Sequence, residues 1–345
     1  MLVIVIIIAN KYCYVNNKIG AKSTKYRNKQ YNAPRTYMKN CLIIINKNAG
    51  TSKKISFEKV EKCLGSEYKY EHRTIPGANV DDTYKFDAVA VCGGDGTLGS
   101  ILNVVHDKPV DLYYFPVGTL NDKAKAQRYE KHKSECPSCN GTINLKPVVY
   151  GKCEKILSSG KYETTDCAKD VFAYVFAAGS FTPIGYTSDV KSKKKFGVLA
   201  YVSQVLKEYK PHRIKAQIVN GKRTYEGEFT LIMFLKSPRC FGFHFNRAFD
   251  QDSASGHLLA IRSPKNHGAV GYIQMFFPFF KAFFLGLKKE RACGNLIFEK
   301  VYSSKITLKN DIDFCKDGEK QTLKKSEYKI SFAKSVCNFS VIEKF

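Results

Sequence analysis

The sequence has few acidic residues and no long apolar run near its start. Its 345 residues contain 31 Asp and Glu against 56 Lys and Arg, a formal net charge of +25 at pH 7. This excess attracts polyanions, whether phosphorylated ligands, anionic lipid headgroups or nucleic acid, without choosing among them. The first apolar run, residues 2–9, is far shorter than the roughly 20 residues of a transmembrane helix. A membrane span is therefore not expected there.

The cysteines lack a regular framework. Twelve are scattered from Cys13 to Cys337, which in a chain of this length is typical of thiols in a reducing compartment rather than of a disulfide-stapled miniprotein. Cys136 and Cys139 are closely spaced, but without a second spaced pair they favour an ordinary loop over a zinc site.

Residues 1–40 contain no Asp or Glu and eight Lys or Arg. An acid-free, basic, polar segment behind a short apolar start is the composition of a targeting peptide, although a basic tail without a signal fits it equally well. We expect an intracellular, peripheral membrane protein in which residues 1–40 are a candidate organelle-targeting leader.

Three strand-to-loop units come next. Apolar runs at residues 41–45, 87–92 and 112–115 predict buried strands, each followed by a loop of small or polar residues. Apolar residues recur at helical spacing from Phe57 and from Leu98, which predicts helices after the first two loops. This order indicates an α/β domain with a mostly parallel sheet, whose ligands gather at the carboxyl ends of the strands.

Short strands dominate from residue 171 onward, with helical spacing near residues 199–206 and 273–287. The change of pattern predicts a β-rich second domain, a sandwich. The expected division is a leader at 1–40, a nucleotide-binding α/β domain at 41–126 to which strands near 328–345 return, a linker or insertion at 127–165, and the β-rich domain at 166–327.

Residues 93–97, with the sequence GGDGT, are the most specific chemical signal. Glycines let the backbone approach a phosphate, and N–H groups at a strand-to-helix turn attract an anion. Asp95 would repel phosphate unless Mg²⁺ and its waters lay between them, so it suggests a metal–nucleotide complex. A plain tight turn is the alternative. The pattern is neither a Walker P-loop nor GxGxxG.

The GGDGT loop resembles that of diacylglycerol, sphingosine, ceramide and NAD kinases. Residues 46–50 (NKNAG) resemble the N-P-x-S/A-G loop of lipid kinases, residues 116–122 (PVGTLND) their P-x-G-T-x-N-D, and residues 316–319 (KDGE) their DGE. The chain thus resembles the diacylglycerol kinase catalytic family from about residue 41 to residue 342. The resemblance implies an NAD kinase- and diacylglycerol kinase-like fold, with a lipid-substrate domain, and an ATP-dependent lipid kinase.

The resemblance also implies the site. Phosphoryl transfer needs positioning, neutralised charge and a proton acceptor, and the family's pattern gives the roles of general base to Glu319 and of Mg²⁺ organiser, through waters, to Asp95. A hairpin turn is the alternative for the DGE segment. The nucleotide-binding residues implied for ATP are Asn46, Asn48, Ala49, Gly50, Thr74, Gly93, Gly94, Asp95, Gly96, Thr97, Gly118, Thr119, Asn121 and Asp122.

Several residues depart from the family pattern. Lys47 replaces a proline and Lys123 a phenylalanine, while Gly99 and Ser100 stand where Asn and Glu are common. Residues 253–256 (SASG) replace the turn that holds a structural Mg²⁺ in bacterial members. Because serine is a poor ligand for a hard cation, we expect no structural metal there.

The acceptor lipid is expected to be neutral. Where sphingosine kinases carry an aspartate for the substrate amine, the residues near Thr182 and Pro183 are uncharged. Diacylglycerol, giving phosphatidic acid, fits best; a sphingoid base or ceramide, or a catalytically impaired lipid- and nucleotide-binding pseudokinase, are the alternatives.

Residues 276–284 hold six phenylalanines, followed by Lys288, Lys289 and Arg291. The segment predicts either a surface for an anionic membrane or a core helix. Patterns of an RRM, a zinc finger or a helix-turn-helix are missing, so no nucleic-acid partner is expected.

Overall fold

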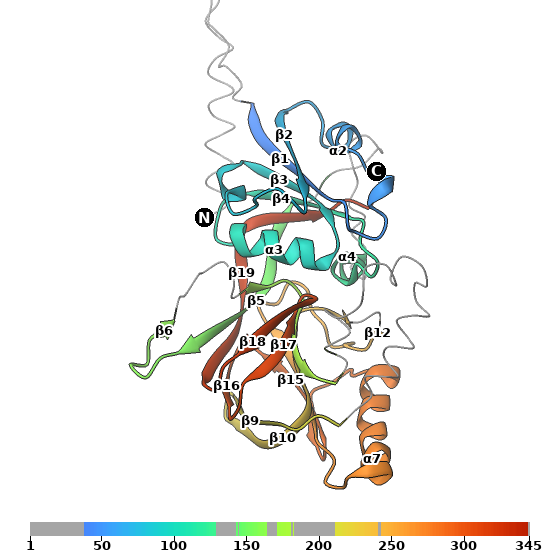
Figure 1. Cartoon of the computed structure of the whole chain (residues 1–345), viewed down its shortest axis with the longest axis vertical. Coiled ribbons are helices and arrows are strands. Elements are labelled where there is room, and N and C mark those ends of the chain that lie inside the picture. Colours follow the sequence, from blue (N-terminus) through green and yellow to red (C-terminus); the bar gives the residue numbers. More distant parts are fainter. Residues whose placement is uncertain are drawn as a thin grey trace, which may run out of the picture. The chain divides into compact units, whose positions relative to one another are not determined.

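The computed structural model describes residues 38–128, 143, 145–163, 171–180, 182, 211–240 and 243–343 (Figure 1). The leader up to residue 37, Cys136 and Cys139, and the helix expected near residues 199–206 lie outside these residues.

The α/β part contains the strands and helices expected from the sequence, close to the expected bounds. Its elements are β1 (Lys39–Asn46), the 3₁₀ turn η1 (Ser52–Lys54), α2 (Phe57–Leu64), β2 (Tyr68–Ile75), the 3₁₀ turn η2 (Thr83–Lys85), β3 (Ala88–Gly93), α3 (Asp95–Val105), β4 (Asp111–Pro116) and α4 (Asp122–Arg128). The strands pair in parallel in the order β2, β1, β3, β4, and β19 (Glu327–Val341) pairs in parallel with β4.

Strand β1 has an uninterrupted apolar sequence because both of its faces are buried. Leu42 and Ile44 belong to the core that includes the apolar residues of α3, whereas Cys41 and Ile43 belong to the core that includes those of α2. A parallel strand that is covered on both faces needs apolar residues at every position rather than at alternate ones.

The carboxyl ends of β1, β3 and β4 lie side by side. Ile45 of β1 is in register with Cys92 of β3, and Cys92 is in register with Phe115 of β4. The loops at residues 46–50, 93–97 and 116–122 therefore leave the sheet at the same edge. We name them loop A, loop B and loop C.

The remaining elements are mostly strands. They are β5 (Lys146–Ile156), β6 (Tyr162–Glu163), β7 (Val171–Phe172), β8 (Val175–Gly179), β9 (Ile214–Asn220), β10 (Arg223–Leu235), β11 (Arg239–Cys240), β12 (Phe243–His244), β13 (Gly256–Arg262), α7 (Gly268–Phe280), the π-helical turn η4 (Lys281–Leu285), β14 (Arg291–Cys293), β15 (Leu296–Val301), β16 (Ser303–Leu308), β17 (Ile312–Lys316), β18 (Glu319–Leu323) and β19. The β-rich region is thus confirmed, and the expected helix at residues 273–287 begins five residues earlier, at Gly268, and ends at Leu285.

The sheet differs from the expected arrangement. Apart from the β11–β12 pair, the described strands join into one 17-stranded mixed sheet, which runs from the α/β part into the β-rich part. Parallel pairing among the named strands is confined to β1 through β4 and β19, and the expectation of a mostly parallel sheet is not confirmed for the sheet as a whole. The mixed pairing arises from β19. The last residues of β19 pair in parallel with β4, and its first residues pair antiparallel with β5 and β16.

Candidate active site

Loop A contacts both of the other loops. The side-chain amide of Asn46, at the end of β1, donates a hydrogen bond of 2.8 Å to Thr97 Oγ1 in loop B. On the other side, a Cβ atom at Gly50 would lie only 2.8 Å from Thr119 Oγ1 in loop C. Glycine at this position therefore lets loop A lie against Thr119 of loop C.

Loops B and C touch through their backbones. The carbonyl of Gly93 accepts hydrogen bonds from the N–H groups of Val117, at 2.9 Å, and Gly118, at 3.1 Å. A Cβ atom at Gly118 would lie 2.5 Å from the Cα atom of Gly94. The three loops therefore form one layer of backbone at the edge of the sheet, where the order of strands and loops in the sequence predicted them.

Helix α3 begins inside this layer. Its N-cap residue, Gly94, provides no side-chain hydrogen bond to the helix. The first N–H groups of an α-helix have no partner within the helix and carry the positive end of its dipole. An uncapped helix start beside two closely packed glycine loops fits a nucleotide phosphate.

Asp95 lies beneath the loops and its carboxylate is buried. The carboxylate accepts hydrogen bonds from the N–H groups of Asp122, at 2.7 Å, and Lys123, at 3.1 Å. Burial, together with the like charge of Asp122, raises the pKa of Asp95 to about 7. The side chain thus ties loop B to the start of α4. Its expected contact with Mg²⁺ through waters stays a prediction.

Asp317 holds the turn that precedes Glu319. Asp317 has a φ of +50° and Gly318 a φ of +99°, which make the tight connection from β17 to β18. The buried Asp317 carboxylate accepts the backbone N–H groups of residues 173–175. Burial raises its pKa to about 6, against the lowering effect of these three hydrogen bonds.

Lys123 is buried between the two aspartates. Its ammonium group donates a hydrogen bond of 3.1 Å to the carbonyl of Ala173. Burial lowers the pKa of Lys123 to about 8, while the charges of Asp317 and Asp95 raise it. This lysine, where the family often has a phenylalanine, thus partly balances two buried carboxylates.

Glu319 lies beside the first turns of α3. The hydroxyl group of Ser100 donates hydrogen bonds to Glu319 Oε1, at 3.4 Å, and to the carbonyl of Gly96, at 3.1 Å. The turn before Glu319 also packs on the helix, since a Cβ atom at Gly99 would lie 2.8 Å from Asp317 Oδ2. A carboxylate more than 200 positions away in sequence is thus brought to the helix that loop B begins.

The other expected site residues mainly shape the loops. Asn48 donates its N–H group to Asn46 Oδ1, and Asn121, with a φ of +50°, donates its side-chain amide to the carbonyl of Gly118 at 3.0 Å. Ala49 is buried in the core on the α2 side.

Two of the expected site residues have side chains with other surroundings. The Asp122 carboxylate is buried 3.6 Å from the guanidinium group of Arg239, a partner that no sequence signal marked. Thr74 is on β2, in register with Ile45, and β1 separates it from loop B.

The side chains that commonly bind metal ions are not clustered in the described part of the chain. Among residues 38–343, where the structure describes them, no group of three or more His, Cys, Asp or Glu is arranged to hold a metal ion. At the turn where bacterial members hold a structural cation, the buried ammonium group of Lys236 donates hydrogen bonds to the carbonyls of Asp250 and Ser253. A lysine thus supplies positive charge to this turn.

Comparison with known proteins agrees with this geometry. The family model described as the diacylglycerol kinase catalytic domain matches residues 40–153, the segment that contains loops A, B and C. Residues 40–153 are thus similar to the diacylglycerol kinase catalytic domain, and this match supports a kinase, as the motifs had indicated.

Relatives and solved structures are similar over larger parts of the chain. A protein of Streptococcus pneumoniae serotype 4 named "Putative lipid kinase" is 24% identical over 212 residues, 57% of this chain and 67% of the relative. One of Staphylococcus aureus strain MSSA476 is 26% identical over 157 residues, 44% of this chain and 46% of the relative. The diacylglycerol kinase structure from Bacillus anthracis str. Sterne aligns at a TM-score of 0.57 and 17% identity, over 88% of this chain and 96% of that one, which shows a shared fold.

Proposed function

We propose that the protein transfers the γ-phosphate of ATP to the hydroxyl group of a neutral membrane lipid, with diacylglycerol as the substrate and phosphatidic acid as the product. The observation that supports this most is the position of Glu319. Its carboxylate is 3.4 Å from a hydroxyl group on α3, the helix that begins in the glycine loop of a kinase domain.

In this mechanism the loops bind and the carboxylate accepts a proton. The backbone N–H groups at the start of α3, with loops A and C against them, hold the phosphates of ATP. Glu319 accepts the proton of the lipid hydroxyl as that oxygen attacks the γ-phosphorus, the bond from this phosphorus to the β–γ bridging oxygen breaks, and ADP leaves with the bond's electron pair. Bound Mg²⁺ supplies charge neutralisation in such reactions, and no step here is assigned to a metal-binding side chain.

Asp317 and Lys123 have positioning roles in the proposal. Asp317 fixes the turn that carries Glu319 against α3, and Lys123 lies between that turn and Asp95 of loop B. Effective catalysis requires this kind of rigidity, because a displacement of about 1 Å can lower a rate by about 100-fold.

The neutral character of the substrate rests on the residues after β8. Ser180 and Thr182 are buried and uncharged, and Thr182 Oγ1 donates a hydrogen bond of 2.7 Å to the carbonyl of Gly179. A carboxylate that would pair with the amine of a sphingoid base is missing from these two positions. Phe181 and Pro183 lie outside the described residues.

A substrate panel tests the proposal. Radiolabelled ATP is supplied with diacylglycerol, sphingosine or ceramide in mixed micelles, or with NAD in solution, with and without residues 1–37. We expect label in diacylglycerol. Label in another lipid would change the substrate, and label only in NAD would overturn the lipid-kinase proposal. Stabilisation by ATP and Mg²⁺ without transfer to any acceptor would indicate the pseudokinase.

A further inference from the structure

Helix α7 and the turn η4 expose a row of large apolar side chains. Phe277 is 65% and Phe284 64% exposed, values far above those of core residues. The rings of Phe276, Phe280 and Phe284 stack at successive helical turns, with centroid separations of 5.5 and 5.4 Å. We name as the aromatic face the exposed residues Ile273, Phe276, Phe277, Phe280, Phe284 and Leu285.

The opposite side of the same helix is part of a core. Met275, Phe279 and Phe283 are buried in a cluster with residues of β8, β10, β13 and β15. Among the described helices, residues 268–285 are long and apolar enough to cross a membrane by length and composition. Crossing would pull these three side chains out of their core, so the packing favours a helix that lies on a surface.

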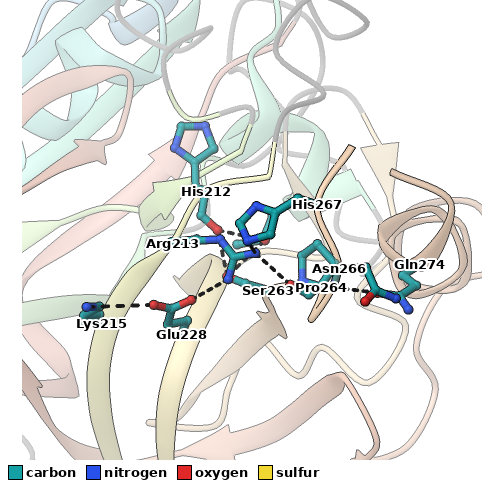
Figure 2. Close-up of polar contacts among 10 residues, drawn as sticks. His212, Arg213, Lys215, Glu228, Ser263, Pro264, Asn266, His267 and Gln274 are labelled. Carbon is teal, nitrogen blue, oxygen red and sulfur yellow. Dashed lines mark hydrogen bonds and ion pairs between the residues drawn. The ribbon is translucent and has the colours of Figure 1, made fainter. Parts of the chain in front are cut away.

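The start of α7 is fixed by a polar network (Figure 2). Arg213, the residue before β9, donates hydrogen bonds to Glu228 Oε2, at 2.6 Å, and to the carbonyl of Pro264, at 3.1 Å. The N–H group of Asn266 donates to Gln274 Oε1 on α7 at 3.4 Å. The aromatic face is therefore held in place on the β-rich region by contacts at its start and along its buried side.

The charged residues within the segment that carries the aromatic face are all lysines. Residues 265–289 contain no Asp or Glu and four lysines, Lys265, Lys281, Lys288 and Lys289, all of them exposed. Exposed aromatic rings flanked by lysines match a bilayer interface, where rings enter the acyl boundary and ammonium groups meet anionic headgroups. A second copy would bring the same lysines together in a chain that already carries a charge of +25.

We propose that the aromatic face docks on the interface of an anionic lipid bilayer. This inference deepens the lipid-kinase proposal and rests on it, since a membrane lipid is the acceptor there. The helix lies in the plane of the interface, with its phenylalanine rings in the acyl boundary and its lysines at the phosphate groups.

Contacts connect this surface to the active site. The ring of Phe243, on β12, lies 5.7 Å from that of Phe284. Strand β12 pairs with β11, where the guanidinium group of Arg239 is 3.6 Å from Asp122 Oδ1 at the start of α4. The β11–β12 hairpin therefore lies between η4 and loop C. Docking on the bilayer would bring the phosphate-binding loops close to the lipid surface.

Vesicle sedimentation tests the docking. Phe277→Ser with Phe284→Ser should weaken binding to vesicles of phosphatidylcholine and phosphatidylglycerol on the order of 100-fold, because each ring loses most of a large apolar burial. The matched control, Tyr302→Ser with Val336→Ser, removes side chains that are 60% and 58% exposed elsewhere. This control should bind as the wild type does.

Charge is tested separately. Replacing Lys281, Lys288 and Lys289 by glutamine should weaken binding to the anionic vesicles by about fivefold per lysine, and the effect should shrink at high salt. Binding to vesicles of phosphatidylcholine alone should change little. Equal losses on both kinds of vesicle would contradict the headgroup contact.

The absence of tryptophan from the sequence allows a direct measurement of insertion. A single Phe277→Trp variant should show a blue-shifted emission, and quenching by lipids with brominated chains, when anionic vesicles are added. Tyr302→Trp should show neither. Unchanged emission of Phe277→Trp on vesicle-bound protein would overturn the proposal.

A soluble substrate separates this proposal from the enzymatic one. The Phe277, Phe284 variant should lose activity on diacylglycerol in vesicles and keep activity on a short-chain diacylglycerol in solution. Wild-type vesicle binding by this variant, or a shift from dimer to monomer without change in vesicle binding, would reject bilayer docking and leave the kinase proposal intact. Normal docking by a wild-type protein that phosphorylates no lipid would reject the kinase proposal alone.

Discussion

Replacement of Gly99 by alanine tests how α3 and the turn before the general base depend on each other. A Cβ atom at Gly99 would lie 2.8 Å from Asp317 Oδ2 and 3.2 Å from Asp317 Cβ. Asp317 cannot easily move away, because its carboxylate holds the backbone N–H groups of residues 173–175. We expect Gly99→Ala to destabilise the fold by about 1–3 kcal/mol, the usual cost of overpacking, and to shift the turn.

A shifted turn moves Glu319 but leaves loops A, B and C in place. The kcat for lipid phosphorylation should therefore fall by about 10- to 100-fold, while the rise in melting temperature on addition of ATP and Mg²⁺ is kept. Ser100→Ala is the matched control: it adds no atom and removes one hydroxyl group, so kcat should change by only a few fold. A wild-type kcat in Gly99→Ala would refute the reasoning.

Three further variants test the buried polar groups. Asp95→Asn should lower the free energy of unfolding by about 1–3 kcal/mol and abolish stabilisation by ATP in thermal shift, because an amide cannot accept both N–H groups of residues 122 and 123. Lys236→Met should lower the free energy of unfolding, measured by urea denaturation, by about 3 kcal/mol, because two carbonyls lose a charged donor. Added Mg²⁺ should not restore the stability. Burial lowers the pKa of His257 to about 4. Because the unfolded chain protonates this histidine at a higher pH than the folded protein does, the free energy of unfolding should fall by about 3 kcal/mol between pH 6.5 and pH 4. In thermal melts over this pH range, His257→Gln should lose less stability than the wild type.

Much of the α/β part was predictable because its signals are local. The apolar run of β1 and the glycines after β3 each report on neighbouring residues in the chain, and the structure follows them closely. The joining of both parts into one sheet was not predictable in this way. It depends on β19 pairing with β5, in a segment that was expected to be a linker, across some 180 positions.

The candidate site shows the same division. The motifs predicted the loops and named Glu319, whereas the burial of Lys123 and the contact of Asp122 with Arg239 depend on elements distant in sequence. The sequence indicated only that Asp317 forms a turn. The structure shows that its carboxylate also accepts three backbone N–H groups. One side of the phenylalanine-rich helix is part of a core, as one of its two interpretations expected, and the other side is exposed. Contact of that side with a membrane stays a prediction.

The central claim, that three glycine loops hold ATP while Glu319 deprotonates a lipid hydroxyl, is tested most directly with Glu319→Gln. Transfer of γ-phosphate to diacylglycerol and the melting temperature with ATP and Mg²⁺ are measured on the same preparation. The account predicts a kcat at least about 100-fold lower with unchanged stabilisation by ATP. A variant that phosphorylates diacylglycerol at the wild-type rate would contradict it.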